Sequence, residues 1–210
     1  MVEWLISDQL IEYNYAVKFM EERVRLISAG LADELAWLLE HPPLYTAGIG
    51  TSDIEVIEKR FPVYKTGRGG KCTYHGPGQR VIYLMLNLKK RSKCDIKLYI
   101  KNLSDWIINA LKHFDILGEF REDRVGIWVN NNGIEEKIAA FGIRVRKWVT
   151  YHGAAINVSP DLSHYRGIIP CGLQNYGISS MKKLGIETSI SGLDNVLKSE
   201  FSKVFISYVS

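Results

Sequence analysis

Two long amphipathic segments, with short apolar runs between and after them, decide the fold class of this chain. Apolar residues recur at helical spacing over residues 10–28 and 96–113, which predicts two helices. The shorter runs, over 35–40, 63–66 and 81–88, have the length of β-strands. Because helices and strands do not alternate one by one, the pattern predicts an α+β fold and not a parallel βαβ fold.

The second half of the chain has the pattern of a β-meander that ends in helix. Strands are predicted over 125–129, 137–141, 142–149 and 151–158. Residues 130–133 have the composition of a hairpin turn, residues 44–50 are rich in turn formers, and helix is predicted from residue 173 onward. Candidate N-caps are Ser179, Ser189 and Ser191. No linker-like stretch divides the chain, so residues 1–210 are expected to form a single domain.

Cysteine usage and the start of the chain indicate a reducing compartment. Cys72, Cys94 and Cys171 are odd in number and widely spaced, which does not suit a disulfide framework. The start of the chain carries early acidic residues and lacks the regions of a secretory signal, so we expect neither a signal nor a transit peptide. The apolar runs are too short to span a membrane. We therefore expect a cytoplasmic protein without a membrane segment.

Charge and ligand spacing argue against two other classes of function. A formal net charge of +4 is too weakly basic to indicate nucleic-acid binding, although it suits an encounter with an acidic protein. The basic run 89–93 is the best local docking patch for such a partner. The chain has no CxxC pair and its five histidines are scattered, so no metal site is expected.

A glycine-rich segment over 68–79 has the composition of a pocket wall. It places Arg68, Thr73 and His75 among several glycines, which let a backbone approach a ligand closely. A tight loop between strands would explain the glycines equally well. The segment matches neither GxxxxGK[ST] nor GxGxxG, so a phosphate or dinucleotide cradle is not indicated. The polar side chains among the glycines favour a pocket.

Cys171, between Pro170 and Gly172, is a candidate nucleophile, and Lys137 is a candidate partner for its thiolate. A lone cysteine is more often a small buried hydrophobe, and a lysine at a strand end is usually solvated. An ammonium within a few ångströms would nevertheless favour the thiolate. Singly, each residue favours the structural explanation. Together with the glycine segment, they are the parts of a covalent acyl-transfer enzyme.

Other titratable residues are weaker candidates. Cys72 lies in the glycine segment and could compete as nucleophile, whereas Cys94 follows the basic run and is expected in a solvated loop. His75 and His152 each occur in a Tyr-His-Gly triplet, and a hydrogen-bonded structural histidine explains both. Structural histidines are also expected at His41 and His113. A Ser-His-Asp hydrolase would be supported by a GxSxG elbow, which the chain lacks.

Four separate motifs occur along the chain in a fixed order. They are Arg68-Gly69-Gly70-x-x-Thr73-Tyr74-His75-Gly76-Pro77-Gly78-Gln79, Lys137-Ile138-Ala139-Ala140-Phe141-Gly142, Trp148-Val149-Thr150-Tyr151-His152-Gly153 and Pro170-Cys171-Gly172. Together they resemble the lipoyl(octanoyl) transferase family, and residues 41–46 resemble that family's early segment. The resemblance implies the fold shared by biotin and lipoate protein ligases, a mixed sheet flanked by helices.

The resemblance also implies an activity and a site. Members of the family move an octanoyl group from octanoyl-acyl carrier protein, through a cysteine thioester, to a lysine of a lipoyl domain, and need no cofactor. Cys171 falls on the nucleophile and Lys137 on the lysine that activates it. The three acyl-binding segments fall on Arg68, Gly69, Gly70, Lys71, Cys72, Thr73, Tyr74 and His75, on Ala140, Phe141 and Gly142, and on Gly153, Ala154 and Ala155. The implied acceptors are the E2 subunits of 2-oxoacid dehydrogenases and the glycine cleavage H protein, and a monomer is expected.

Two other functions remain open at this point. An ATP-dependent lipoate or biotin ligase of the same fold needs a nucleotide-binding loop and no nucleophilic cysteine. A non-catalytic protein would bind lipoyl domains without turnover. The chain also departs from the family pattern, because Arg80 stands where an apolar residue is expected and residues 50–53 lack expected basic residues.

Overall fold

The computed structural model describes residues 2–52, 55–170 and 176–205, and these residues form a mixed sheet with helices on both faces. The strand order of the main sheet is β1 (Val2–Leu10), β2 (Glu34–Glu40), β6 (Gln79–Met85), β10 (Val149–Asn157), β9 (Ile134–Arg146), β8 (Gly126–Asn131) and β7 (Gly118–Phe120). A short strand, β11 (Gly177–Ile178), also pairs with β9. The β1–β2 and β9–β11 pairs are parallel and the other pairs are antiparallel, which confirms the expected mixed α+β architecture.

Two apolar layers hold the helices to the sheet. Helix α1 (Tyr13–Ala29) covers one face and buries Met20, Val24 and Ile27 against strand residues such as Trp37. Helices α2 (Ile96–Lys112) and α3 (Ile190–Phe205) cover the other face. Asp95 caps α2 by accepting from the backbone N–H groups of Lys97 and Leu98.

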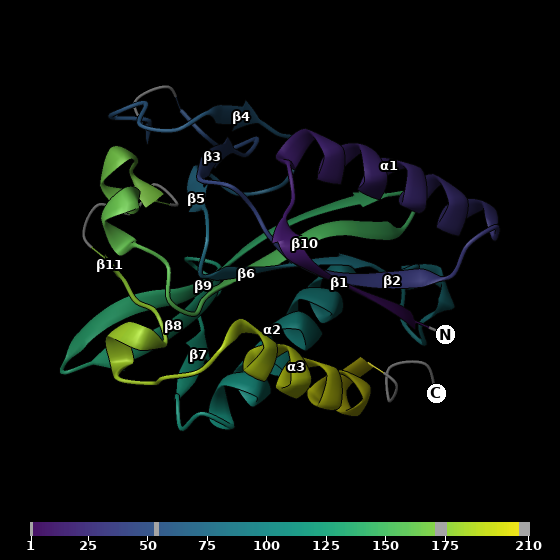
Figure 1. Cartoon of the computed structure of the whole chain (residues 1–210). Coiled ribbons are helices and arrows are strands. Elements are labelled where there is room, and N and C mark those ends of the chain that lie inside the picture. The colour runs from purple at the N-terminus through teal and green to yellow at the C-terminus, as the bar shows by residue number, and fades with distance from the viewer. Residues whose placement is uncertain (1, 53–54, 171–175, 206–210) are drawn as a thin grey trace.

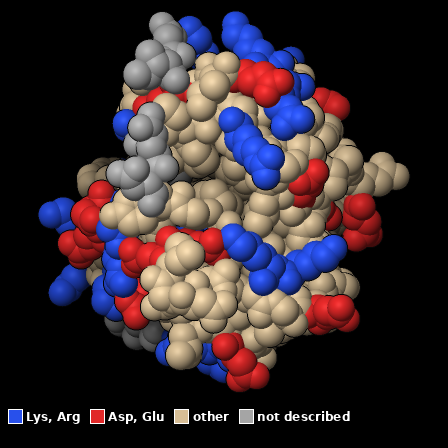
Figure 2. All heavy atoms as spheres, turned by 90° about the vertical axis from the view of Figure 1, so that its left-hand side faces the viewer, with Lys and Arg blue, Asp and Glu red and all other residues tan. Residues whose placement is uncertain are grey.

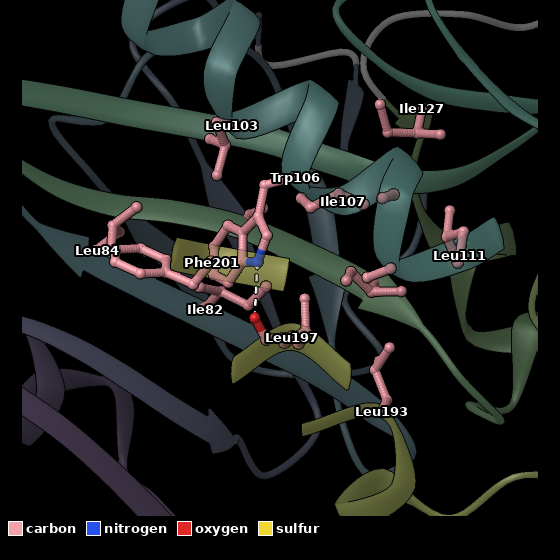
Figure 3. Close-up of a cluster of buried hydrophobic side chains, with 14 of the residues drawn as sticks. Ile82, Leu84, Leu103, Trp106, Ile107, Leu111, Ile127, Leu193, Leu197 and Phe201 are labelled. Carbon is pink, nitrogen blue, oxygen red and sulfur yellow. Dashed lines mark hydrogen bonds between the residues drawn. The ribbon is translucent and has the colours of Figure 1, made fainter. Parts of the chain in front are cut away.

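Trp106 lies at the centre of the second layer (Figure 3). Its indole N–H donates to the carbonyl of Leu197 in α3 at 2.8 Å, and its ring meets Phe201 edge-on with centroids 5.2 Å apart. The buried indole thus satisfies its only donor while it fixes α3 against α2.

A second, smaller sheet lies on the α1 side of the main sheet (Figure 1). It consists of β3 (Leu44–Ala47) between β4 (Val63–Lys65) and β5 (Thr73–His75). The glycine-rich segment 68–79 therefore runs through β5 and connects this small sheet to β6. The two sheets are the walls between which a site can form.

Sequence patterns missed the first strand of the chain. Residues Val2–Leu10 form β1 at the edge of the sheet, so α1 begins at Tyr13 and not at residue 10. As an edge strand, β1 is only partly buried, through Val2, Trp4 and Ile6, and its longest apolar run, Trp4-Leu5-Ile6, is too short to stand out. The turn expected over 44–50 is also wrong in part, because Leu44–Ala47 pair with two strands.

Three other expectations about elements are corrected. The two strands expected over 137–149 are one long strand, Ile134–Arg146, joined to β10 by a turn at Lys147 and Trp148. Described residues after 175 form β11 and a 3-10 turn, Lys182–Leu184, before α3 begins at Ile190, so helix does not run from residue 173. Of the three candidate N-caps, Ser189 precedes α3 and its hydroxyl accepts from the N–H of Gly192 at 3.0 Å.

The basic run 89–93 is not wholly solvated, as had been expected. Arg91 is buried, and both of its terminal nitrogens donate to the Glu34 carboxylate, at 3.0 and 2.9 Å. This bidentate pair removes Arg91 from any docking patch and leaves Lys89, Lys90 and Lys93 exposed. Within the described ranges, no helix has the length and apolar character needed to cross a membrane.

Candidate active site

A cavity of about 250 Å³ lies between the main sheet and the small sheet. Most of the residues predicted to bind an acyl chain line it: Arg68, Gly70, Lys71, Thr73, His75, Ala140, Phe141, Gly142, Gly153, Ala154 and Ala155. Lys137 lines it too. Three segments far apart in the sequence thus meet at one cavity.

Gly69, Cys72 and Tyr74 are not part of the cavity lining. Successive strand side chains point to opposite faces, so Thr73 and His75 face the cavity while Cys72 and Tyr74 point away. Cys72 is fully buried in a cluster with Tyr45 and Tyr74. The prediction that Cys72 could act beside the pocket is therefore not supported by its position.

Small residues form the floor of the cavity. In the β9–β10 pair, Gly142 lies opposite Gly153 and Ala140 lies opposite Ala155. A Cβ at Gly142 would come within 2.7 Å of Arg68 Cδ, and Gly153 adopts a φ of +156° with the carbonyl of Ile82 2.3 Å from where a Cβ would be. These positions require glycine, because the backbones and Arg68 approach each other too closely for a side chain.

Arg68 ties the glycine-rich loop to the small sheet. Its Nη2 donates to the carbonyl of Thr46 at 2.8 Å, to Thr46 Oγ1 at 2.6 Å and to the carbonyl of Lys71 at 2.9 Å. Nη1 donates to the carbonyl of Gly69 at 2.9 Å. A buried guanidinium with this many backbone partners fixes the shape of the loop at the edge of the cavity.

A β-bulge turns Lys137 toward the cavity. Ile127 pairs with Ala139 and Trp128 pairs with Lys137, which leaves Ile138 as the extra residue of β9. The bulge reverses the alternation of side chains, so that Lys137 and Ala140 both reach the cavity. Gly126 makes room for the lysine, because a Cβ there would lie 3.1 Å from Lys137 Cε.

The amine of Lys137 is held in a buried position. Nζ donates to the carbonyl of Val125 at 3.1 Å and lies 4.8 Å from the centre of the Trp128 ring. The residue is only 4% exposed and has no carboxylate within ion-pair distance among the described residues. The neighbouring carboxylate, Glu136, pairs with Lys183 instead. The Lys137 amine is therefore available to bind an anion other than these carboxylates.

Cys171 lies outside the described residues, but the chain on both sides of it lies at Lys137. Pro170 and Lys137 line the same small space of about 10 Å³. On the other side, Ile178 is paired with Lys137 in the β9–β11 register, and the N–H of Ser179 donates to the carbonyl of Lys137 at 2.9 Å.

Three buried histidines and Tyr83 form a cluster beside the cavity. His41 Nδ1–H donates to the carbonyl of Ile11 at 2.5 Å, which leaves Nε2 to accept from the hydroxyl of Tyr83 at 2.7 Å. His75 and His152 line the cavity itself. Burial lowers the pKa of His41 to about 4 and the pKa values of His75 and His152 to about 3. All three imidazoles are therefore neutral at pH 7.

This cluster predicts a pH dependence of stability. The unfolded chain takes up protons near pH 6.5 whereas the folded chain does not, so stability is complete above pH 6.5 and falls as the pH drops toward 4. We expect a loss of about 1.5 kcal/mol per histidine between pH 6.5 and 5. Urea unfolding at about pH 7.5, 6 and 5 measures it, and His152→Gln should reduce the slope by about one third. A flat profile over this window would contradict the prediction.

Sequence reasoning missed several residues that line the cavity. They are Tyr13, Val81, Tyr83, Asp123, Arg124 and Val125, and His152 joins them although it was read as structural. Tyr13 belongs to the first predicted helix and Val125 to a predicted strand, and these patterns indicate elements and not a site. Only the packing of the small sheet against the main sheet brings them to the cavity.

Comparisons with known proteins show the family of this chain. The model of the lipoyl protein ligase A/B catalytic domain matches residues 12–202. An octanoyltransferase of Wolbachia pipientis subsp. Culex pipiens (strain wPip) is 72% identical over 205 residues, covering 98% of this chain and 100% of the relative. The octanoyltransferase of Ehrlichia canis (strain Jake) is 55% identical over 209 residues, covering 99% of this chain and 98% of the relative.

Solved structures show the same fold at low identity. A bipartite lipoate protein ligase from Thermoplasma acidophilum superposes with a TM-score of 0.72 at 17% identity, covering 98% of this chain and 84% of that chain. A lipoate-protein ligase A bound with ATP gives 0.73 at 16% identity, covering 97% and 86%. The fold is thus that of lipoyl protein ligase catalytic domains. Within that class, the chain belongs to the octanoyltransferase family and is an acyltransferase.

Proposed function

We propose that the chain moves an octanoyl group from octanoyl-acyl carrier protein, through a thioester on Cys171, to a lysine of lipoyl domains. The proposed acceptors are those of 2-oxoacid dehydrogenase E2 subunits and of the glycine cleavage H protein. The observation that carries the proposal is a cavity whose floor consists of small residues and whose lining includes the buried Lys137. At about 250 Å³ it is near the lower limit of ligand pockets, which suits one short unbranched chain.

The proposed reaction has two acyl-transfer steps. The Cys171 thiolate attacks the donor thioester, and the donor leaves as a thiol after it takes up a proton. Exchange of one thioester for another is near thermoneutral, so the step needs no ATP. The acceptor amine then attacks the Cys171 thioester, forms an amide and releases the thiolate. Lys137 as an ammonium stabilises the Cys171 thiolate and gives its proton to the departing donor thiolate. The neutral Lys137 amine then accepts the proton that the acceptor amine loses, so the ammonium is restored beside the released thiolate.

Surface charge can contribute to the encounter with an acidic donor. Figure 2 shows Lys and Arg side chains above and below an uncharged area in the middle of one face, with Asp and Glu side chains among them. We propose that the exposed lysines of the run 89–93 also raise the rate of encounter with the carrier protein. If the KM for the donor does not rise as the salt concentration rises, the lysines do not have this role.

We place the enzyme in the cytoplasm, where a catalytic thiol stays reduced.

Intact-mass spectrometry after incubation with octanoyl-acyl carrier protein tests the mechanism. We expect one octanoyl group per chain, located on Cys171 by peptide mapping and labile to hydroxylamine. Cys171→Ala should form no adduct, whereas Cys72→Ala, the matched control, should form it normally because Cys72 points away from the cavity.

The alternatives predict different results. An ATP-dependent ligase would show no adduct without ATP and would stay active as Cys171→Ser. A non-catalytic protein would bind the carrier or the lipoyl domain and form no adduct. An adduct on any residue other than Cys171 would refute the proposed mechanism.

A further inference from the structure

Trp128 is a buried residue of β8 that contacts the proposed catalytic lysine. It is 1% exposed and lies opposite Lys137 in the strand register. The Lys137 amine lies 4.8 Å from the centre of its ring, within the range of a cation–π interaction. Its indole N–H donates to the carbonyl of Arg124 at 2.9 Å, so the ring cannot rotate without losing that bond.

The same ring contacts the chain on the other side of the nucleophile. Tyr176 is the first described residue after 171–175, and its ring meets Trp128 edge-on with centroids 5.1 Å apart. The Arg124 guanidinium lies 4.6 Å from the Tyr176 ring and 4.9 Å from the Trp128 ring, and it donates to the Tyr176 hydroxyl at 2.9 Å. Trp128 is thus a common neighbour of the Lys137 amine and of Tyr176.

The two cations at the Trp128 ring, Arg124 and Lys137, differ in whether a carboxylate pairs with them. Arg124 is paired with Glu135 and Asp123, so its charge is largely neutralised by carboxylates. Lys137 has only the carbonyl of Val125 and the ring as described partners. A π face stabilises an ammonium without neutralising it, which leaves the full charge for a thiolate.

We propose that Trp128, together with Arg124 and Tyr176, is the positioning unit of the active site. It holds the Lys137 amine and the Tyr176 side chain against one rigid ring, and so limits how the amine can move. The inference rests on the proposed function and deepens it. These are positioning residues and not catalytic ones, because they act through Lys137 and through the segment after Cys171.

The unit has a measurable consequence, because a misplacement of about 1 Å can cost about 100-fold in rate. Trp128→Leu should lower the single-turnover rate of acyl transfer by about 10- to 100-fold. It should also move the midpoint of the pH dependence of Cys171 alkylation by iodoacetamide to higher pH. Trp128→Phe keeps a π face and should recover most of both losses. Tyr176→Leu should shift both readouts in the same direction as Trp128→Leu, though less.

Trp148→Leu is the matched control, since Trp148 is 41% exposed in the β9–β10 turn. It should leave the alkylation profile and the transfer rate unchanged. A Trp128→Leu protein with the native profile and rate would overturn the proposal. If that variant does not fold, Tyr176→Leu decides, because Tyr176 is 37% exposed and outside the core. Failure of the native protein to form the Cys171 adduct would instead refute the proposed function.

Discussion

Lys137→Met should lower the single-turnover rate of octanoyl transfer by about 10²- to 10⁴-fold, the usual contribution of a positioned acid–base group. Methionine is unbranched, lacks only the terminal amine position of lysine and can occupy the space beside Gly126, so the cavity should keep its shape. The change removes a buried charge that has no carboxylate partner among the described residues, and the protein should therefore stay folded. The loss should appear in both acyl-transfer steps.

Rapid-quench mass spectrometry of the acyl-enzyme, followed by addition of a lipoyl domain, measures the two steps separately. Lys182→Met is the matched control, because Lys182 is exposed on a 3-10 turn outside the cavity. Thermal unfolding monitors folding in both variants. A Lys137→Met protein whose rates stay within about threefold of the native protein would exclude the acid–base role, since such a change is below 1 kcal/mol in barrier height.

Local sequence patterns predicted the parts of the site better than its assembly. Residue type and its sequence neighbours single out the thiol and amine candidates, whereas the glycines at 142 and 153 were placed at the site only through the family resemblance. The direction of Lys137 is not visible, because it depends on a bulge at Ile138 that appears only when β9 pairs with β8. Trp128 was read only as a strand residue, since its contacts come from separate segments.

The fold shows the same division between local and long-range information. Helices α1 and α2 were predicted from spacing that repeats within each helix, with errors confined to their ends. Strand β1 was missed because it owes its conformation to pairing with β2. The role of Arg80 could not be predicted either, since its partner lies more than a hundred residues away, in α3.

Arg80 and Asp194 form a buried ion pair between β6 and α3. Arg80 Nη2 donates to Asp194 Oδ2 at 2.8 Å, and both side chains are 4% exposed. Arg80 Nε and Nη1 and Asp194 Oδ1 have no hydrogen-bond partner among the described residues. Burial raises the pKa of the Asp194 carboxyl although the Arg80 charge opposes this. The attraction thus does not fully offset the loss of hydration, which is common for buried pairs.

This balance predicts that replacing one partner of the pair destabilises the folded protein more than replacing both. Arg80→Met and Asp194→Leu should each lower the free energy of unfolding by about 3–5 kcal/mol, because each leaves one buried charge unpaired. The double variant should recover most of the loss, since two apolar side chains then face each other in the same space. Urea unfolding at neutral pH gives the double-mutant cycle.

The exposed Lys101–Asp105 pair supplies the control cycle, and its coupling should not exceed about 1 kcal/mol. If the losses at Arg80 and Asp194 were simply additive, the two charges would not be acting as a pair. The double variant should also keep its transfer rate, because Arg80 points to α3, on the face of the sheet opposite α1 and the small sheet. An apolar residue at position 80, which the family pattern favours, would then be compatible with this chain once Asp194 is also replaced.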